Sequence, residues 1–182
     1  MDRHPQGHPL LNLYLRLFWI WLHARLKPPI RLGDTIEMRL RVWPNDIDVN
    51  GHMNNGRYMT IIDLALIEYI TRSGVLKVLV RKGWRPMLGG SMISFRRGLK
   101  PFHGYTLRFA IVCWDERWSY MRFDFVRDDR AVAAGHAKGA FVGAEGIVNT
   151  ADTHAAFGIY ESSPGIPASI AAWIEADQMI RA

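Results

Sequence analysis

The chain has 182 residues, which fits one domain with a short appendage and allows a sizeable core. Hydrophobic residues make up 49% and charged residues 22%, a composition that excludes a disordered or fibrous protein. The formal net charge is +6. The sequence has no run of five basic residues and no recognisable nucleic-acid module, so it indicates no nucleic-acid partner. A positive charge of this size better suits a phosphate-bearing small molecule or an anionic membrane.

Residues 9–26 form the first predicted helix, which is apolar over most of its surface. Four polar positions fall within an arc of about 60° on a helical projection: Asn12, Arg16, His23 and Lys27. The run is shorter than the roughly 20 apolar residues of a membrane span and has Arg16 at its centre, which does not favour spanning. Two interpretations stay open: a helix in the membrane interface through residues 9–27, or a helix packed on its own domain or on a partner subunit.

Residues 35–43 alternate between apolar and polar and predict a half-buried strand, which Pro44 ends. A polar loop follows, with two carboxylates, a histidine and several asparagines before the next apolar element. Residues 54–73 then predict a long helix that is apolar around most of its circumference and therefore buried. Asn54 or Asn55 is suited to cap its start, and Gly74 to end it in the left-handed conformation. A dense polar loop between two apolar elements is where we expect chemistry.

The second half of the chain predicts a meander of antiparallel strands. After a short helix, four strand patterns follow: 86–97, 105–115, 118–127 and 131–142. Small residues line the last strand, which lets a neighbouring element approach closely. The lone Cys113 has no disulfide partner, so we expect a core residue and a reducing, cytoplasmic location.

These elements predict an α+β fold in which an antiparallel sheet wraps around a single long helix. We divide the chain into an N-terminal helix over residues 1–30, a central domain over 31–150, and a tail over 151–182. The tail is expected to end in a helix over residues 168–181.

The tract from Asp46 to Tyr58 resembles the signature of hot-dog-fold acyl-CoA thioesterases related to 4-hydroxybenzoyl-CoA thioesterase. That signature reads Asp-x-Asp-x-x-Gly-His-x-Asn-Asn-x-x-Tyr and occurs with the element order predicted above. With the hydrophobic N-terminal segment, the chain is similar to the group called thioesterase superfamily member six. The resemblance covers residues 35–148 and implies a hot-dog fold, an antiparallel five- to six-stranded sheet around one long buried helix.

By matching position, the resemblance implies that Asp48 is the general base or nucleophile toward the thioester carbonyl. It places Asn55 at the helix N-terminus, where the family uses a backbone N–H to polarise that carbonyl. His52, Asn54 and Tyr58 match pocket-shaping positions and are expected to contact the substrate. From the residues alone, Asp48 is equally a loop-capping carboxylate, and the histidine and both asparagines have structural alternatives of the same kind.

Arg96 and Arg97 end the first strand of the meander, just before Gly98, and are candidates for the phosphates of coenzyme A, because guanidinium groups suit phosphate. Solvated charges at a strand end are the ordinary alternative. Asp46 is expected to form structural hydrogen bonds.

The function implied is hydrolysis of an acyl- or aroyl-CoA by a homo-oligomer, a dimer or a dimer of dimers, with the site between subunits. No metal is expected, and no cofactor besides the coenzyme A of the substrate. One alternative is a non-catalytic, membrane-associated module that binds acyl-CoA or lipid. Another is an enoyl-CoA hydratase, which the Asn54-Asn55 pair fits less well.

Overall fold

The computed structural model describes residues 9–181. In chain order its elements are α1 (Pro9–Ala24), β1 (Ile36–Arg41), a 3-10 turn (Pro44–Asp46), α2 (Asn55–Arg72), α3 (Val75–Lys82), β2 (Arg85–Phe95), β3 (Gly104–Trp114), β4 (Ser119–Arg127), β5 (Arg130–Gly143), β6 (Gly146–Val148), α4 (Thr150–Phe157) and α5 (Ala168–Arg181). The predicted strands and long helices are all present.

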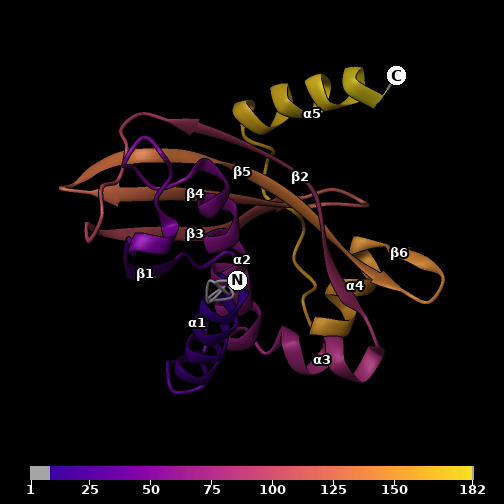
Figure 1. Cartoon of the computed structure of the whole chain (residues 1–182). Coiled ribbons are helices and arrows are strands. Elements are labelled where there is room, and N and C mark those ends of the chain that lie inside the picture. Colours follow the sequence, from indigo (N-terminus) through magenta and orange to yellow (C-terminus); the bar gives the residue numbers. More distant parts are fainter. Residues whose placement is uncertain (1–8, 182) are drawn as a thin grey trace, which may run out of the picture.

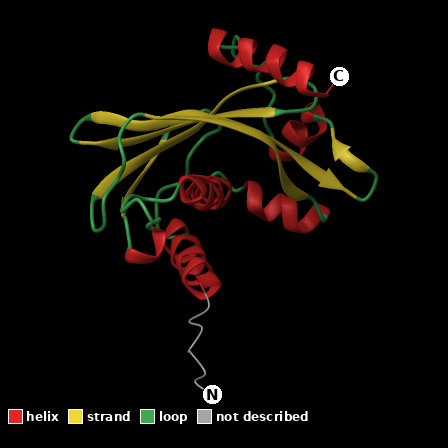
Figure 2. Ribbon diagram, turned by 45° about the horizontal axis from the view of Figure 1, so that its top comes forward, coloured by secondary structure: helices red, strands yellow, loops and turns green. Residues whose placement is uncertain are grey.

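An antiparallel sheet in the order β1-β3-β4-β5-β2 curls around α2, and β6 extends the far end of β5 (Figure 1). Helices α1 and α3 lie on the same side of the sheet as α2, whereas α5 crosses the opposite face (Figure 2). The prediction of an α+β fold with a five- to six-stranded antiparallel sheet around one long helix is therefore confirmed. Strands β1 and β2 form the two edges of the sheet.

Helix α2 begins and ends where its sequence predicts. The Asn54 side chain accepts the Gly56 N–H at 2.8 Å, and Gly74 after the helix adopts a φ of 79°. Between these ends α2 packs into the concave face of the sheet, where Phe109, Phe123 and Phe125 are 0% exposed. Burying three aromatic rings makes this layer the main source of hydrophobic stability.

One tight turn and one glycine help to set the geometry of the meander. Asp128 and Asp129 both have positive φ, 50° and 55°, which matches the type I′ turn of a tight hairpin between β4 and β5. In β5, a Cβ on Gly135 would lie 2.1 Å from the Met92 carbonyl oxygen of β2. The predicted close approach of another element to the small residues of β5 is thus confirmed, and Cys113 is buried in the core as expected.

Two elements near the C-terminal end of the central domain were not predicted from the sequence pattern. Strand β6 pairs with the end of β5, and α4 follows with Asn149 as its cap, whose side chain accepts the Ala151 N–H at 2.8 Å. The boundaries at residues 30 and 150 stay a prediction.

Candidate active site

The polar loop between β1 and α2 folds into a small hairpin. Ile47 and Met53 form an isolated antiparallel bridge, and the Asp48 N–H donates to the His52 carbonyl at 2.9 Å. Gly51 closes the turn with a φ of 75°, a conformation that costs glycine nothing. From here on this segment, residues 46–55, is called the site loop.

Asp46 anchors the site loop from inside the protein. Its side chain is 0% exposed and accepts a two-pronged hydrogen bond from Arg16 of α1, with N–O distances of 2.8 and 3.1 Å. The Trp43 N–H adds a third hydrogen bond at 2.9 Å, and the Arg57 guanidinium lies 3.8 Å away. The expected structural role of Asp46 is therefore confirmed, because a carboxylate so enclosed does not reach a substrate.

Asp48 lies on the outer side of the same hairpin and is half-buried. Its Oδ1 accepts the Asn50 N–H at 2.8 Å, an Asx turn that fixes the orientation of the carboxylate. Asp48 is not among the residues that line the apolar cavity described below.

The N-terminus of α2 presents one backbone donor. Asn54 takes up the Gly56 N–H with its side chain and the Arg57 N–H with its carbonyl oxygen. Among the described residues, the Asn55 N–H has no acceptor, and the positive end of the helix dipole lies behind it. Asn54, Asn55 and His52 are all exposed, with the His52 ring packed over Gly98.

The other predicted substrate-binding residues differ in their exposure. Tyr58 is 2% exposed and packs edge-on against Phe95 and Phe125, with ring centroids 5.0 and 4.8 Å away. It shapes the core beneath the site loop and does not face solvent in one chain. Arg96 and Arg97 are exposed immediately after β2, where a phosphate can reach them.

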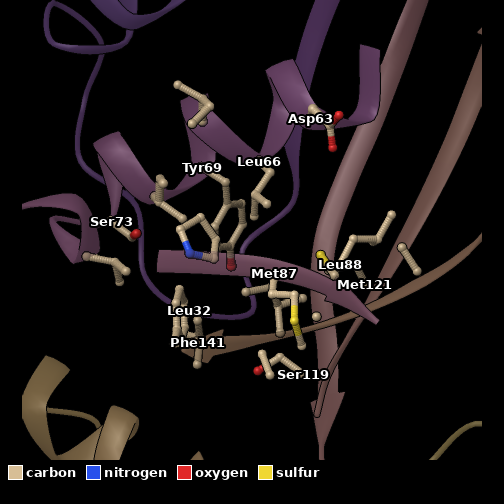
Figure 3. A pocket seen from close by; sticks show the side chains of 18 of the residues that line it. Leu32, Asp63, Leu66, Tyr69, Ser73, Met87, Leu88, Ser119, Met121 and Phe141 are labelled. Carbon is tan, nitrogen blue, oxygen red and sulfur yellow. The ribbon is translucent and has the colours of Figure 1, made fainter. Parts of the chain in front are cut away.

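A cavity of about 220 Å³ runs beneath α2, between the helix and the strands β2, β4 and β5 (Figure 3). Its walls are mostly apolar, with Leu66 on the helix facing Met87, Met121 and Phe141 on the sheet. An apolar cavity with few polar groups at its rim is the form that small-molecule sites usually take. This face of the sheet therefore offers an apolar space of the kind that an acyl group could enter.

The carboxylate at the rim of this cavity is Asp63, which the sequence pattern did not single out. Asp63 reaches solvent, but burial of part of its carboxyl group against the apolar wall raises the pKa of that group. Glu68, the other acid inside α2, is 2% exposed and paired with Lys27 and Arg72 at 2.8 and 3.0 Å. Asp63 has no ion-pair partner among the described residues. Its lack of a partner shows only in the tertiary structure, so no local sequence signal identifies it.

Two further polar groups line the cavity. The Ser73 Oγ is buried and has no hydrogen-bond partner among the described residues. His154 of α4 is 7% exposed, and burial lowers the pKa of its imidazole. Asp63 and Ser73 are ten residues apart on one helical element, so the cavity extends about 15 Å along α2.

Replacing Asp63 by Asn should stabilise the fold at neutral pH. Because the folded-state pKa of Asp63 is raised, ionisation costs folding free energy as the pH rises from about 4, the unfolded value, through the folded pKa. Urea unfolding of the Asp63→Asn protein should therefore give a larger free energy of unfolding than the parent at pH 7 and the same value near pH 3.5. Asp129→Asn, at an exposed turn, is the control and should show no such pH-dependent gain.

Comparison with known proteins agrees with this architecture. The family model of the thioesterase-like superfamily matches residues 42–174. Over 121 residues the chain is 31% identical to protein THEM6 of Xenopus laevis, covering 64% of this chain and 58% of that protein. Over 100 residues it is 32% identical to the thioesterase poxG of Penicillium oxalicum, covering 47% and 33%. The chain thus spans little more than half the length of the THEM6 protein that it matches.

Among solved structures, the gentisyl-coenzyme A thioesterase BH1999 superposes with a TM-score of 0.59 at 19% identity, over 67% of this chain and 99% of that one. This likeness supports the hot-dog fold. The family model spans well over half of the sequence and includes the site loop and every cavity residue except Leu32, and the chain therefore belongs to the thioesterase-like superfamily.

Proposed function

We propose that the protein is an acyl-CoA thioesterase that hydrolyses the thioester of an acyl- or aroyl-CoA. The observation that carries this proposal is the apolar cavity under α2, which has a carboxyl group at its rim and lies on the same helix whose N-terminus carries the site loop. The thioesterases poxG and BH1999, to which the chain is similar in sequence and in fold respectively, agree with this chemistry.

The proposed site is completed by a second copy of the chain. Tyr58 at the start of α2 contacts Phe95 at the end of β2, whereas Met87 and Leu88 at the start of β2 line the cavity. If two β2 edges pair antiparallel, the end of each strand comes beside the start of its partner. The site loop of one subunit then approaches the cavity of the other, which brings Asp48 to a pocket that its own chain does not offer.

In this arrangement each group has a distinct task. Asp48 acts as general base for water or as nucleophile, and the Asn55 N–H stabilises the oxyanion that forms on the carbonyl. Asn54 caps α2 and so holds that amide in place, and His52 lies at the entrance of the proposed site. The Asp63 carboxyl, whose pKa is raised by burial, is suited to protonate the leaving thiolate.

Arg96 and Arg97 supply the proposed contact with coenzyme A. Both are exposed at the end of β2, close to the position that the partner's cavity would take. Guanidinium groups bind phosphate with two parallel hydrogen bonds, so this pair suits the phosphates while the acyl group enters the cavity.

The activity is tested by incubating the purified full-length chain with saturated acyl-CoAs of several lengths and with benzoyl-CoA, and titrating the released thiol. We expect turnover, with a preference for acyl groups that fill a cavity about 15 Å long. Tight acyl-CoA binding without thiol release would instead favour the non-catalytic module, and an absorbance change with crotonyl-CoA would favour a hydratase.

A second proposal, peripheral membrane contact, is supported by the outer face of α1. Large apolar side chains at helical spacing lie on this face and are 38–63% exposed: Tyr14, Leu15, Phe18, Trp19 and Leu22. Arg25 lies nearby, and exposed Lys77, Arg81 and Lys82 of α3 lie on the same side of the sheet (Figure 2). Apolar side chains bordered by basic residues suit an anionic membrane surface. None of the helices within residues 9–181 is long and apolar enough to cross a bilayer.

Replacing both Phe18 and Trp19 by Ser should weaken binding to vesicles of phosphatidylcholine with phosphatidylserine. We expect a loss of about 10-fold or more, because burying either ring stabilises the bound state by on the order of 1.5 kcal/mol. Co-sedimentation measures the effect, and binding should also fall as salt is raised. Tyr160→Ser removes an aromatic ring that is 86% exposed elsewhere and should change nothing. A parent protein that ignores such vesicles would refute the membrane proposal without touching the enzymatic one.

A further inference from the structure

Two charged hydrogen bonds from the Arg16 guanidinium join helix α1 to the site loop. The Arg16 side chain is 21% exposed, and its guanidinium donates to both oxygens of the fully buried Asp46 carboxylate. Two parallel N–H to O bonds fix both distance and orientation, which one point contact does not. Arg16 and Asp46 are 30 residues apart in sequence, so this contact is a purely tertiary link.

Asp46 is also hydrogen-bonded to the chain just before the site loop and near the end of that loop. Its side chain receives the Trp43 N–H at 2.9 Å, and its carbonyl oxygen receives the Asn54 N–H at 2.8 Å. Asn54 is the cap of α2 and lies beside the proposed oxyanion donor. Asp48 lies two residues after Asp46, on the arm of the hairpin opposite Asn54. Through its carboxylate and its backbone carbonyl, Asp46 thus links the segment of the proposed base to that of the proposed oxyanion donor.

A second ion pair attaches the chain just after the end of α1 but does not touch the site loop. Lys27 donates to Glu68 at 2.8 Å, in the C-terminal half of α2. Both pairs therefore hold α1 in its place, but only the pair made by Arg16 reaches the residues of the site loop. Lys27 consequently provides a matched control for the effect of loosening α1.

We propose that Arg16 is a positioning residue for the thioesterase site, and that α1 braces the site loop through Asp46. This inference rests on the function proposed above, since it concerns how Asp48 and the Asn55 amide are held. It also means that whatever binds the exposed outer face of α1 acts on the same helix that holds the site loop.

The first test compares Arg16→Gln with Lys27→Gln in the full-length protein. We expect Arg16→Gln to lower kcat by about 10- to 100-fold with little change in KM, because small misplacements of reacting groups are costly. Backbone amides of residues 46–55 should exchange hydrogen for deuterium faster. Lys27→Gln should leave both kcat and the exchange of the site loop unchanged.

A second variant separates positioning from folding, because Arg16→Gln leaves the buried Asp46 carboxylate with the Arg57 guanidinium at 3.8 Å as its remaining cation among the described residues. The double change Arg16→Met with Asp46→Leu removes both charges and should restore the melting temperature, while kcat stays low and exchange in the site loop stays fast. Arg16→Lys, which keeps the charge but loses the fork, should recover only part of kcat.

The positioning role of Arg16 would be refuted if Arg16→Gln kept the parental kcat and the parental exchange of the site loop. It would also be refuted if Lys27→Gln lost as much kcat as Arg16→Gln. The exchange measurement needs no turnover. A parent protein that hydrolyses no acyl-CoA would refute the proposed function, and slow exchange of the site loop that depends on Arg16 would in that case still establish the mechanical link.

Discussion

Replacing Asp48 by Asn should lower kcat for acyl-CoA hydrolysis by about 10²- to 10⁴-fold, the usual contribution of a positioned general base. The substitution keeps the size of the side chain and the oxygen that accepts the Asn50 N–H, so the Asx turn at 2.8 Å is preserved. It removes the charge that activates water or attacks the carbonyl. KM should change little, because the acyl group and the coenzyme A bind elsewhere. Steady-state thiol release at saturating substrate measures the effect.

Asp63→Asn is the informative comparison for Asp48→Asn, because both are carboxylates near the same proposed pocket. We expect a smaller loss of kcat at Asp63, and a change in the pH dependence of kcat/KM, since the pKa of this carboxyl is raised by burial. An Asp48→Asn protein with parental kcat, beside an inactive Asp63→Asn protein, would move the role of base from the site loop to α2.

The fold was predictable because its main elements have strong local signals. The alternating strand before Pro44, the apolar α2 with Asn54 as its cap, and the tight turn at Asp128 and Asp129 each carry their own physical cause. Strand β6 and helix α4 were missed. Three residues are too few to show a strand period, and α4 is short and only weakly amphipathic.

The candidate site was predictable only in part, because its contacts join distant segments. The position of Asp48 in the loop follows from the sequence, but the buried Arg16–Asp46 pair links residues 30 apart and has no local pattern. The structure shows α1 packed on its own domain, and the membrane interpretation of its other face stays a prediction. One face packs on α2 and the site loop, with Arg16 and Lys27 at its two ion pairs, and the other leaves Phe18 and Trp19 more than half exposed.

The role of Asp63 at the cavity could likewise not be predicted from the local sequence. Asp63 and Glu68 look alike in the sequence of α2, and only tertiary structure shows that Glu68 is neutralised by two cations while Asp63 faces an apolar wall. Burial and pairing set the difference, and neither is encoded in the spacing of residues along one helix.

Replacing Ser91 by Pro in β2 should convert the proposed dimer into a monomer and abolish most of the activity. The Arg96 N–H donates to the Val132 carbonyl at 2.8 Å. Antiparallel ladder bonds recur at every second residue, so the N–H groups of Ser94 and Met92 point to β5 and that of Ser91 points to the open edge. Proline at Ser91 therefore removes a donor from the edge while sparing the ladder with β5.

The edge strand itself favours such pairing. Most positions along β2 are exposed, apolar Leu88 and Phe95 among them at 49% and 42%, and an unpaired edge of this length is a template for another strand. Light scattering after size exclusion should show a dimer for the parent and a monomer for Ser91→Pro. If the site needs both subunits, kcat/KM should fall by about 100-fold or more, because the site loop and the cavity are then separated.

Ser91→Thr is the matched control, since threonine suits a strand and keeps the N–H. It should remain dimeric and active. Circular dichroism should show an intact fold in both variants, which separates loss of pairing from loss of structure. A Ser91→Pro monomer with parental kcat/KM would show that one chain holds a complete site. Asp48 would then have to reach the cavity of its own chain, and the two-subunit arrangement would be wrong even though the hydrolytic activity stood.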